Sequence, residues 1–312
     1  MAWLTMDEIP SFLRIDAKKE VEIIVQRMTE FRDRELLMTG KEKMAIVLGL
    51  SGGLDSAVVC RLWTEVVGPE NVYPVIMPGP TSNSDSDDLA RLLAIRLQTP
   101  QANRVKLPIS EADITHALGA DLDSEGPGGL TRRGNVMARL RMLRLRDRVS
   151  QLAEEHPEVM FRLAGTENAS EHWMAFFTIS GDQSSDIEIL TGYLKTQVWQ
   201  LGKHFCLSPE ILDRDPSPEL GDCQTDEEAL PSVYWQVDSV LFHLLRMGDD
   251  PADVRRMLRE EKLRDLLELV HSPLHTFIQY DTAERILQWI IDHLGKLEIP
   301  YELTGDRLYH QS

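Results

Sequence analysis

The segment Ser51-Gly52-Gly53-Leu54-Asp55-Ser56 (SGGLDS) places two hydroxyl groups and a carboxylate around a pair of glycines. A glycine turn that leads into a helix presents backbone N–H groups at the positive end of the helix dipole, which suits a phosphate. The turn has no lysine, so it is not the GxxxxGK[ST] loop of the common nucleoside triphosphatases. An ordinary glycine turn would not need the serines and the aspartate. The segment therefore predicts a phosphate cradle of another type.

A strand and a helix must hold this loop. The apolar run 45–50 predicts a buried strand, and helical character resumes at Ala57. Further strands are expected at 71–78, 104–108 and 159–164, helices at 16–37, 81–97, 134–155 and from Ser110, and a loop at 121–129. This alternation predicts an α/β fold, a doubly wound parallel sheet with flanking helices and ligands at the carboxyl ends of the strands.

A second polar segment, AGTENASE, directly follows the expected strand at 159–164, just as SGGLDS follows its own strand. Because the carboxyl ends of parallel strands meet at one edge, both segments are expected to share one site. From about Pro231 the chain has only helical patterns. We therefore expect an α/β domain over 1–235 and a helical C-terminal appendage over 236–312.

The cysteine content and the distribution of apolar residues indicate the cellular compartment. The cysteines, Cys60, Cys206 and Cys223, are odd in number and form no CxxC pair, which argues against a zinc ribbon or a disulfide framework. The N-terminus lacks a signal pattern, and no run approaches the ~18 apolar residues of a membrane span. These features predict a cytoplasmic protein without a membrane partner.

The net charge of −18 argues against a nucleic-acid substrate, because a nucleic-acid binder needs a basic surface. One segment is an exception and is rich in arginine: Arg132, Arg133, Arg139, Arg141, Arg144, Arg146 and Arg148. This arginine-rich segment fits a small phosphorylated ligand, a subunit interface or an acidic neighbouring helix.

Four more segments follow SGGLDS in order: RRGNVMARLRM, LAGTENASEHWMAFFTISGD, LTGYLKTQVWQL and DPSPELGDCQTDEEAL. Over roughly residues 20–245 the chain resembles the ammonia-dependent NAD synthetase family, which belongs to the N-type ATP pyrophosphatases. The resemblance implies adenylation of the carboxylate of deamido-NAD by ATP, release of pyrophosphate, and displacement of AMP by ammonia. It also implies a homodimer.

The resemblance also implies residue roles. The ATP-binding residues would be Gly49, Leu50, Ser51, Gly52, Gly53, Asp55, Ser56, Thr166, Lys195 and Ser217. Asp55 and Lys195 would be catalytic, and Asp55 and Glu171 would hold Mg²⁺. Asn135, Arg139 and Asp186 would bind the acceptor substrate.

Several of these residues also fit roles without chemistry. Glu171 fits the first turn of a helix capped by Ser170, Lys195 fits a solvated helix start, and the arginines fit ion pairs with acidic surface. The run Asp226-Glu227-Glu228 is interpreted as a solvated helix start rather than a metal site.

Two departures from the family concern the acceptor. In FFTISGDQSS, Ile179 replaces the usual lysine and Ser184-Ser185 replace glycines. Losing one charge-assisted hydrogen bond to a ligand costs on the order of 1.5–3 kcal/mol. The segment LVHSPLHTFIQYD lacks the family's C-terminal His-Lys-Arg cluster. The acceptor is therefore deamido-NAD or a different carboxylic acid of a specialised pathway.

The nitrogen source and two other functions complete the expectations. Only fifty residues precede SGGLDS, too few for a fused glutaminase, so nitrogen would come from free ammonia or from a separate glutaminase. A catalytically silent ATP-binding protein is disfavoured by the intact Asp55, Glu171 and Lys195. A tRNA-modifying pyrophosphatase is disfavoured by the acidic charge.

Overall fold

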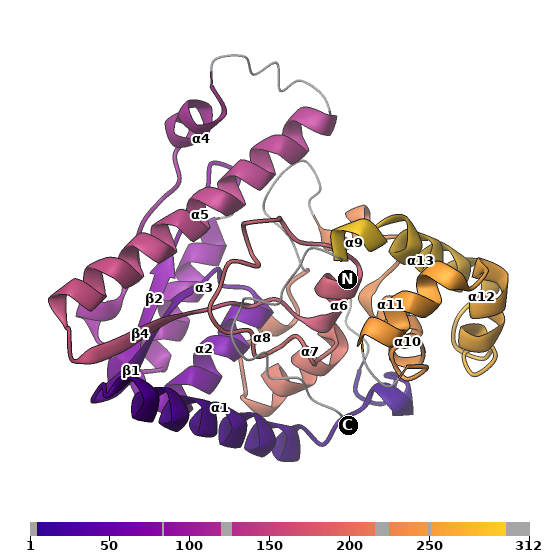
Figure 1. Ribbon diagram of the computed structural model, residues 1–312, viewed down its shortest axis with the longest axis horizontal. Coiled ribbons are helices and arrows are strands. Elements are labelled where there is room, and N and C mark those ends of the chain that lie inside the picture. Colours follow the sequence, from indigo (N-terminus) through magenta and orange to yellow (C-terminus); the bar gives the residue numbers. More distant parts are fainter. Residues whose placement is uncertain (1–4, 83, 120–126, 216–224, 249–250, 298–312) are drawn as a thin grey trace.

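The computed structural model describes residues 5–82, 84–119, 127–215, 225–248 and 251–297 (Figure 1). Its centre is a four-stranded sheet with the strand order β3-β2-β1-β4, in which every pairing is parallel. The strands are β1 (Lys43–Gly49), β2 (Val72–Ile76), β3 (Val105–Lys106) and β4 (Val159–Ala164). β1 lies in the middle and pairs with both β2 and β4, so the loops that follow these strands meet at one edge.

Helices fill the chain between and after the strands. The first group is α1 (Ala17–Thr39), α2 (Leu54–Val67), α3 (Ser84–Arg96), α4 (Glu111–Leu118) and α5 (Pro127–Glu155). After β4 come α6 (Ala169–Trp173), α7 (Lys195–His204), α8 (Pro209–Leu212) and α9 (Asp226–Ala229). The last group is α10 (Tyr234–Leu245), α11 (Pro251–Glu260), α12 (Leu263–His271), α13 (Tyr280–Asp292) and α14 (Leu294–Leu297).

The two faces of the sheet bury different side chains of β1, because side chains alternate along a strand. Ile46 and Leu48 pack into a large core with α1, α2 and α3. Ala45 and Val47 pack into a smaller core with α5. Figure 1 shows the long helix α5 covering the sheet on the side opposite α1. Helices on both faces of a parallel sheet confirm the predicted α/β class.

Several element boundaries differ from the sequence prediction, and two of these differences have a local cause. Helix α5 begins at Pro127, inside the expected loop 121–129, because proline is favoured in the first turn of a helix, where its missing N–H is not needed. The strand expected at 104–108 is reduced to Val105–Lys106, since it pairs only with β2 at the sheet edge and Pro108 lacks an N–H. Residues 120–126 lie outside the described part.

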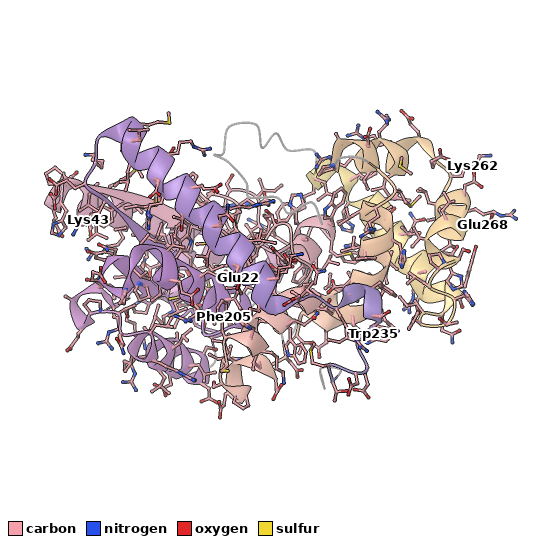
Figure 2. All side chains as sticks on the ribbon, turned by 90° about the horizontal axis from the view of Figure 1, so that it is seen from below. Glu22, Lys43, Phe205, Trp235, Lys262 and Glu268 are labelled. Carbon is pink, nitrogen blue, oxygen red and sulfur yellow. The ribbon has the colours of Figure 1, made fainter. Side chains whose placement is uncertain are left out.

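The C-terminal helices are joined to the rest by a shared hydrophobic core. Leu244 of α10, Ile286 of α13 and Leu297 of α14 belong to the same buried cluster as α1 and α2. The domain boundary expected after residue 235 falls inside α10, which packs against α6 and α7. Figures 1 and 2 show these helices grouped beside the sheet domain, with Lys262 and Glu268 on their outer side. No helix within the described residues is long and apolar enough to cross a membrane.

Candidate active site

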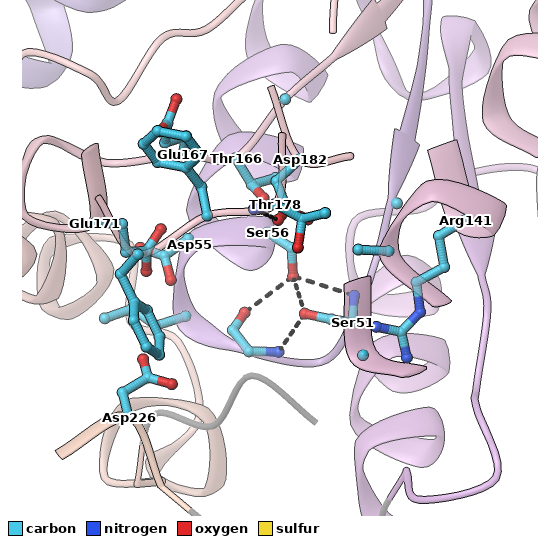
Figure 3. Close-up of a pocket in the computed structure, with 18 of the residues that line it drawn as sticks. Ser51, Asp55, Ser56, Arg141, Thr166, Glu167, Glu171, Thr178, Asp182 and Asp226 are labelled. Atoms are coloured by element: carbon cyan, nitrogen blue, oxygen red, sulfur yellow. Dashed lines mark hydrogen bonds between the residues drawn. The ribbon is translucent and has the colours of Figure 1, made fainter. Parts of the chain in front are cut away.

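A cavity of about 940 Å³ opens at the carboxyl ends of β1, β2 and β4 (Figure 3). Its lining joins most of the residues predicted for ATP and Mg²⁺: Gly49, Leu50, Ser51, Gly53, Asp55, Ser56, Thr166, Glu171 and Lys195. Asn135, predicted to bind the acceptor, also lines it. SGGLDS and AGTENASE therefore meet in one site, as their shared position after strands predicts. Ser217 lies outside the described residues.

The SGGLDS loop is held by its own hydroxyl groups, shown as dashed lines in Figure 3. Ser56 Oγ accepts the N–H of Ser51 at 3.3 Å, donates to the carbonyl oxygen of Gly53 at 3.1 Å and lies 3.0 Å from Ser51 Oγ. Ser56 is buried, whereas Ser51 is exposed to the cavity. Ser56 thus shapes the loop, and Ser51 is available to a ligand.

Two glycines give the loop its path. Gly52 has φ +81°, and a Cβ there would lie 2.3 Å from the carbonyl oxygen of Ser86 at the start of α3. Gly53 is the N-cap of α2 and has no side chain to accept hydrogen bonds from the first turn. The N–H groups at the start of α2 therefore face the cavity without a competing cap, which suits a phosphate.

Lys195, at the first position of α7, lies at the centre of the charged cluster. Its Nζ donates to Asp55 Oδ2 at 2.6 Å and to Glu171 Oε1 at 2.8 Å. Asn168 orients the carboxylate of Asp55, because its Nδ2 donates to Asp55 Oδ1 at 2.9 Å, and its Oδ1 caps α6 by accepting the backbone N–H of Glu171. The alternative of a solvated lysine does not hold, since Lys195 is only 3% exposed.

Burial and charge act on the cluster together. Burial disfavours the ammonium form of Lys195, but Asp55 and Glu171 outweigh it and raise the pKa of the lysine above its ordinary value. Burial also raises the pKa of Glu171, and Lys195 opposes that rise. The two carboxylates need a cation between them, and in this structure the lysine supplies it.

The donor set fits a magnesium ion that arrives with a triphosphate. Asp55 and Glu171 turn carboxylate oxygens toward the same point, and Mg²⁺ is usually held by one or two carboxylates plus substrate phosphates. No group of three or more His, Cys, Asp or Glu side chains in the described part of the chain is placed to hold a metal. The protein therefore offers part of a coordination shell, which phosphate oxygens would complete.

Asp226 corrects the interpretation of 226–228 as a solvated helix start. It is only 5% exposed, lines the cavity and accepts a 2.8 Å hydrogen bond from the hydroxyl of Tyr234. Burial raises the pKa of Asp226, which Lys195 partly offsets. Lys195 Nζ lies 5.2 Å from the centroid of the Tyr234 ring. The residues next to Asp226 in the sequence do not reveal this, because its partners Tyr234 and Lys195 come from other helices.

Another part of the cavity lining is aromatic and carries a lysine that the sequence did not reveal. Lys296 of α14 donates to the carbonyl oxygen of Ala175 at 2.6 Å, and its Nζ lies 4.6 Å from the centroid of Phe177. Trp289 and His293 line the same cavity. Trp289 belongs to α13, His293 to the turn after it and Lys296 to α14. The C-terminal residues of the site therefore lie downstream of LVHSPLHTFIQYD, the segment in which the sequence analysis expected them.

Three residues predicted for the acceptor differ in their surroundings. Asn135 lines the cavity and accepts a 2.8 Å hydrogen bond from Thr178 Oγ1. Arg139 donates to the carbonyl oxygen of Ile179 at 3.1 Å, and Asp186 pairs with Arg146 and accepts the N–H of Leu163 at 2.8 Å. Neither Arg139 nor Asp186 is among the described residues that line the cavity.

Three arginines of the arginine-rich segment pair with acidic side chains: Arg133, Arg144 and Arg146. Arg133 pairs with Glu111 at 2.6 Å, and Arg144 pairs with Asp113 at 3.1 Å, so two of these arginines tie α5 to α4. Arg141 differs, because it lines the cavity and donates to the carbonyl oxygen of Met77 at 3.1 Å. In Figure 3 it lies across the cavity from Asp55 and Glu171.

Comparison with known proteins agrees with this arrangement. A model of the NAD synthase family matches residues 24–276. An NH(3)-dependent NAD(+) synthetase of Trichlorobacter lovleyi is 36% identical over 251 residues, which cover 80% of this chain and 84% of the relative. Among solved structures, NMN synthetase from Francisella tularensis shares 25% identity at a TM-score of 0.63 and covers 94% of this chain and 100% of its own. The NH3-dependent NAD synthetase of Campylobacter jejuni has the same fold, with a TM-score of 0.59, 21% identity and coverage of 92% and 98%. The chain belongs to the NAD synthase family and is an ATP-dependent carbon–nitrogen ligase.

Proposed function

We propose that this protein amidates deamido-NAD, using ATP and ammonia and releasing AMP and pyrophosphate. One observation carries the proposal. A single cavity joins the SGGLDS phosphate cradle and the Asp55–Lys195–Glu171 cluster to an end formed by Asn135, Phe177 and Lys296. This layout suits a triphosphate at one end and a carboxylate-bearing aromatic ring at the other.

The phosphate end supports adenylation of the acceptor. The acceptor carboxylate would attack the α-phosphorus of ATP, and pyrophosphate would leave toward the SGGLDS loop. The N–H groups at the start of α2 and the ammonium group of Lys195 oppose the charge that builds on the phosphates. No covalent bond to the protein is needed, so catalysis rests on positioning and electrostatics.

Magnesium belongs to the same proposal. When bound, Mg²⁺ neutralises phosphate charge and holds the triphosphate in line for displacement. Asp55 and Glu171 are the residues that would hold it. The ammonium group of Lys195 donates hydrogen bonds to both carboxylates in this structure. When these carboxylates hold Mg²⁺ instead, the ammonium group can turn toward phosphate oxygens.

The aromatic end would hold the acceptor for the second step. Ammonia would attack the carbonyl carbon of the acyl adenylate, form the amide and expel AMP. Phe177 and Trp289 line the cavity and supply aromatic contact area for the pyridine, and the ammonium group of Lys296 offers a partner for a phosphate of the acceptor. Lys296 thereby takes over the charge that the chain lacks at Ile179.

Nicotinate mononucleotide is the second candidate acceptor. Two observations favour it: Ile179 removes one cation expected to contact the dinucleotide, and the similar Francisella structure is that of an NMN synthetase. Both candidates carry the same nicotinate carboxylate, so the chemistry proposed above is unchanged.

One experiment separates these acceptors. The protein is incubated with ATP, Mg²⁺ and ammonium chloride plus deamido-NAD, nicotinate mononucleotide or a panel of other aromatic acids. Chromatography then follows AMP, pyrophosphate and the amide. We expect NAD from deamido-NAD at the highest kcat/KM. A higher kcat/KM for nicotinate mononucleotide would identify that acid as the acceptor and NMN as the product. ATP binding without amide formation from any acid would overturn the proposal.

The oligomeric state and the nitrogen source are further parts of this proposal. The protein is proposed to act in the cytoplasm as a homodimer, with ammonia taken from solution or received from a separate glutaminase. Sedimentation velocity of the full chain tests the dimer, and a single species at the monomer mass of 35.5 kDa would contradict it.

A further inference from the structure

Glu171 and Lys195 of the charged cluster come from two different helices. Glu171 lies on α6, which has five residues, and Lys195 begins α7 after a loop of more than twenty residues. The hydrogen bonds of Lys195 Nζ at 2.6 and 2.8 Å require the two helices to keep one relative position. The two helices pack against each other, and α10 packs against both.

Asp238 on α10 contacts both helices through one carboxylate. Its Oδ1 accepts a hydrogen bond from Ser170 Oγ, beside Glu171, and its Oδ2 accepts the N–H of Thr196, beside Lys195, at 2.7 Å. Ser170 Oγ also accepts the N–H of Lys195 at 2.8 Å. Asp238 and Ser170 are both 0% exposed.

These bonds replace the missing cap of α7. The residue before the helix is Leu194, which has no side-chain oxygen, so the first N–H groups need partners from elsewhere. Ser170 takes the N–H of Lys195, and Asp238 takes the N–H of Thr196. A carboxylate is also favoured at this end of the helix dipole.

A buried carboxylate is a costly choice for a purely structural contact. Burial raises the pKa of Asp238 to about 6, against the opposing effect of its hydrogen bonds from Ser170 and Thr196. Asp238 is not among the described residues that line the cavity, so it would act only through its neighbours.

We propose that Asp238 is a positioning residue for catalysis, which holds Glu171 and Lys195 in the relative position that adenylation needs. The inference rests on the proposed function. It assigns to α10 a role in the reaction, although none of its residues, all of which the structure describes, lines the cavity. Misplacing catalytic groups by about 1 Å costs on the order of 100-fold in rate.

The test compares Asp238→Asn and Ser170→Ala with Ser239→Ala. Ser239 is the next residue of α10, is also 0% exposed and donates to the carbonyl oxygen of Trp235 at 2.7 Å, away from the cluster. We expect kcat to fall about 100-fold in the first two variants, with the KM for ammonium unchanged. Ser239→Ala should keep its kcat although its melting temperature falls. Ser170→Thr keeps the hydroxyl and should retain most of the activity.

A double variant gives the decisive comparison. If Asp238 acts through Ser170, then Asp238→Asn combined with Ser170→Ala should be no slower than the slower single variant. Multiplying losses, or an unchanged kcat in Asp238→Asn with a lower melting temperature, would overturn the proposal. If Asp238→Asn does not fold, the kcat of Ser170→Ala compared with that of Ser170→Thr tests the proposal. A wild-type protein that amidates no acceptor would instead contradict the proposed function, and this outcome is visible before any variant is compared.

Discussion

Lys296 donates a 2.6 Å hydrogen bond to the carbonyl oxygen of Ala175, which lies 121 residues earlier in the chain. Its Nζ also lies 4.6 Å from the centroid of Phe177, and both lysine and ring line the cavity. Trp289 adds a second bond of the same kind, because its Nε1 donates to the carbonyl oxygen of Met174 at 2.9 Å. The C-terminal helices therefore complete the site and are not only an appendage to it.

Lys296→Ala is expected to weaken acceptor binding. Removal of one charge-assisted hydrogen bond costs on the order of 1.5–3 kcal/mol, or about 10- to 100-fold in affinity. The KM for the acceptor should rise by that factor while the KM for ATP stays constant, because Lys296 contacts Ala175 and Phe177 rather than the SGGLDS loop. Steady-state kinetics with each substrate varied in turn measures both.

Lys262→Ala is the matched control. Lys262 also belongs to the C-terminal helices, but it is exposed on their outer side in Figure 2. It should leave both KM values unchanged. An unchanged acceptor KM in Lys296→Ala, or a rise of the same size in Lys262→Ala, would contradict the role given to Lys296.

Asp55→Ala and Glu171→Ala should each abolish adenylation and leave the fold intact. Each variant keeps one carboxylate on Lys195, so the buried lysine retains a partner. The loss of one of two proposed metal ligands should lower kcat at least about 100-fold. Pyrophosphate release measures the activity, and circular dichroism reports the fold. Glu22→Ala, on the exposed face of α1, serves as the control. Near-wild-type turnover in either variant would contradict the proposal that Asp55 and Glu171 hold Mg²⁺.

Local sequence patterns predict the parts of the site that lie directly after strands. The run 159–164 coincides with β4, and the helix expected from Ala57 is α2, which begins three residues earlier, at Leu54. Gly52 and Ser56 belong to a loop whose residue types alone indicate a phosphate cradle. Each of these predictions depends on a few neighbouring residues, which is why the sequence is sufficient for them.

Tertiary packing decides the residues that the sequence did not reveal. Asp226, Asp238 and Lys296 each look like an ordinary polar residue on a helix. Burial distinguishes the two aspartates, and the contacts with Ala175 and Phe177 distinguish Lys296. For Asp238 the burial arises because α10 packs against α6, α7 and α13, segments far from it in the chain. Ser56 shows the same limit, since its role inside the loop depends on hydrogen bonds that spacing does not specify.

Magnesium is expected to bind tightly only together with ATP. Asp55 and Glu171 supply two protein ligands, and phosphate oxygens must supply others. We expect Mg²⁺ alone to leave the melting temperature nearly constant, and Mg²⁺ with ATP to raise it, since a ligand at 100 times its Kd stabilises by about 2.7 kcal/mol. EDTA should abolish turnover in the presence of ATP. A full thermal shift with Mg²⁺ alone would show a preformed metal site and contradict this prediction.

Gly52→Ala should destabilise the protein more than alanine at either of two comparison glycines. A left-handed backbone costs a non-glycine residue about 1–2 kcal/mol, and a forced contact costs about 1–3 kcal/mol more. Gly52 combines both, with φ +81° and a Cβ that would lie 2.3 Å from the backbone oxygen of Ser86. We therefore expect its free energy of unfolding to fall by about 2–5 kcal/mol.

The comparison glycines separate the two causes. Gly40 has φ +67° and nothing within 4 Å of a Cβ, so Gly40→Ala tests the backbone cost alone. Gly53 has φ −86° and would meet only Ser51 Oγ, at 3.3 Å, so Gly53→Ala tests a mild contact alone. Urea unfolding of the three variants measures the differences. If Gly52→Ala loses no more stability than Gly40→Ala, the close approach of Ser86 is not what requires glycine at the start of the phosphate cradle.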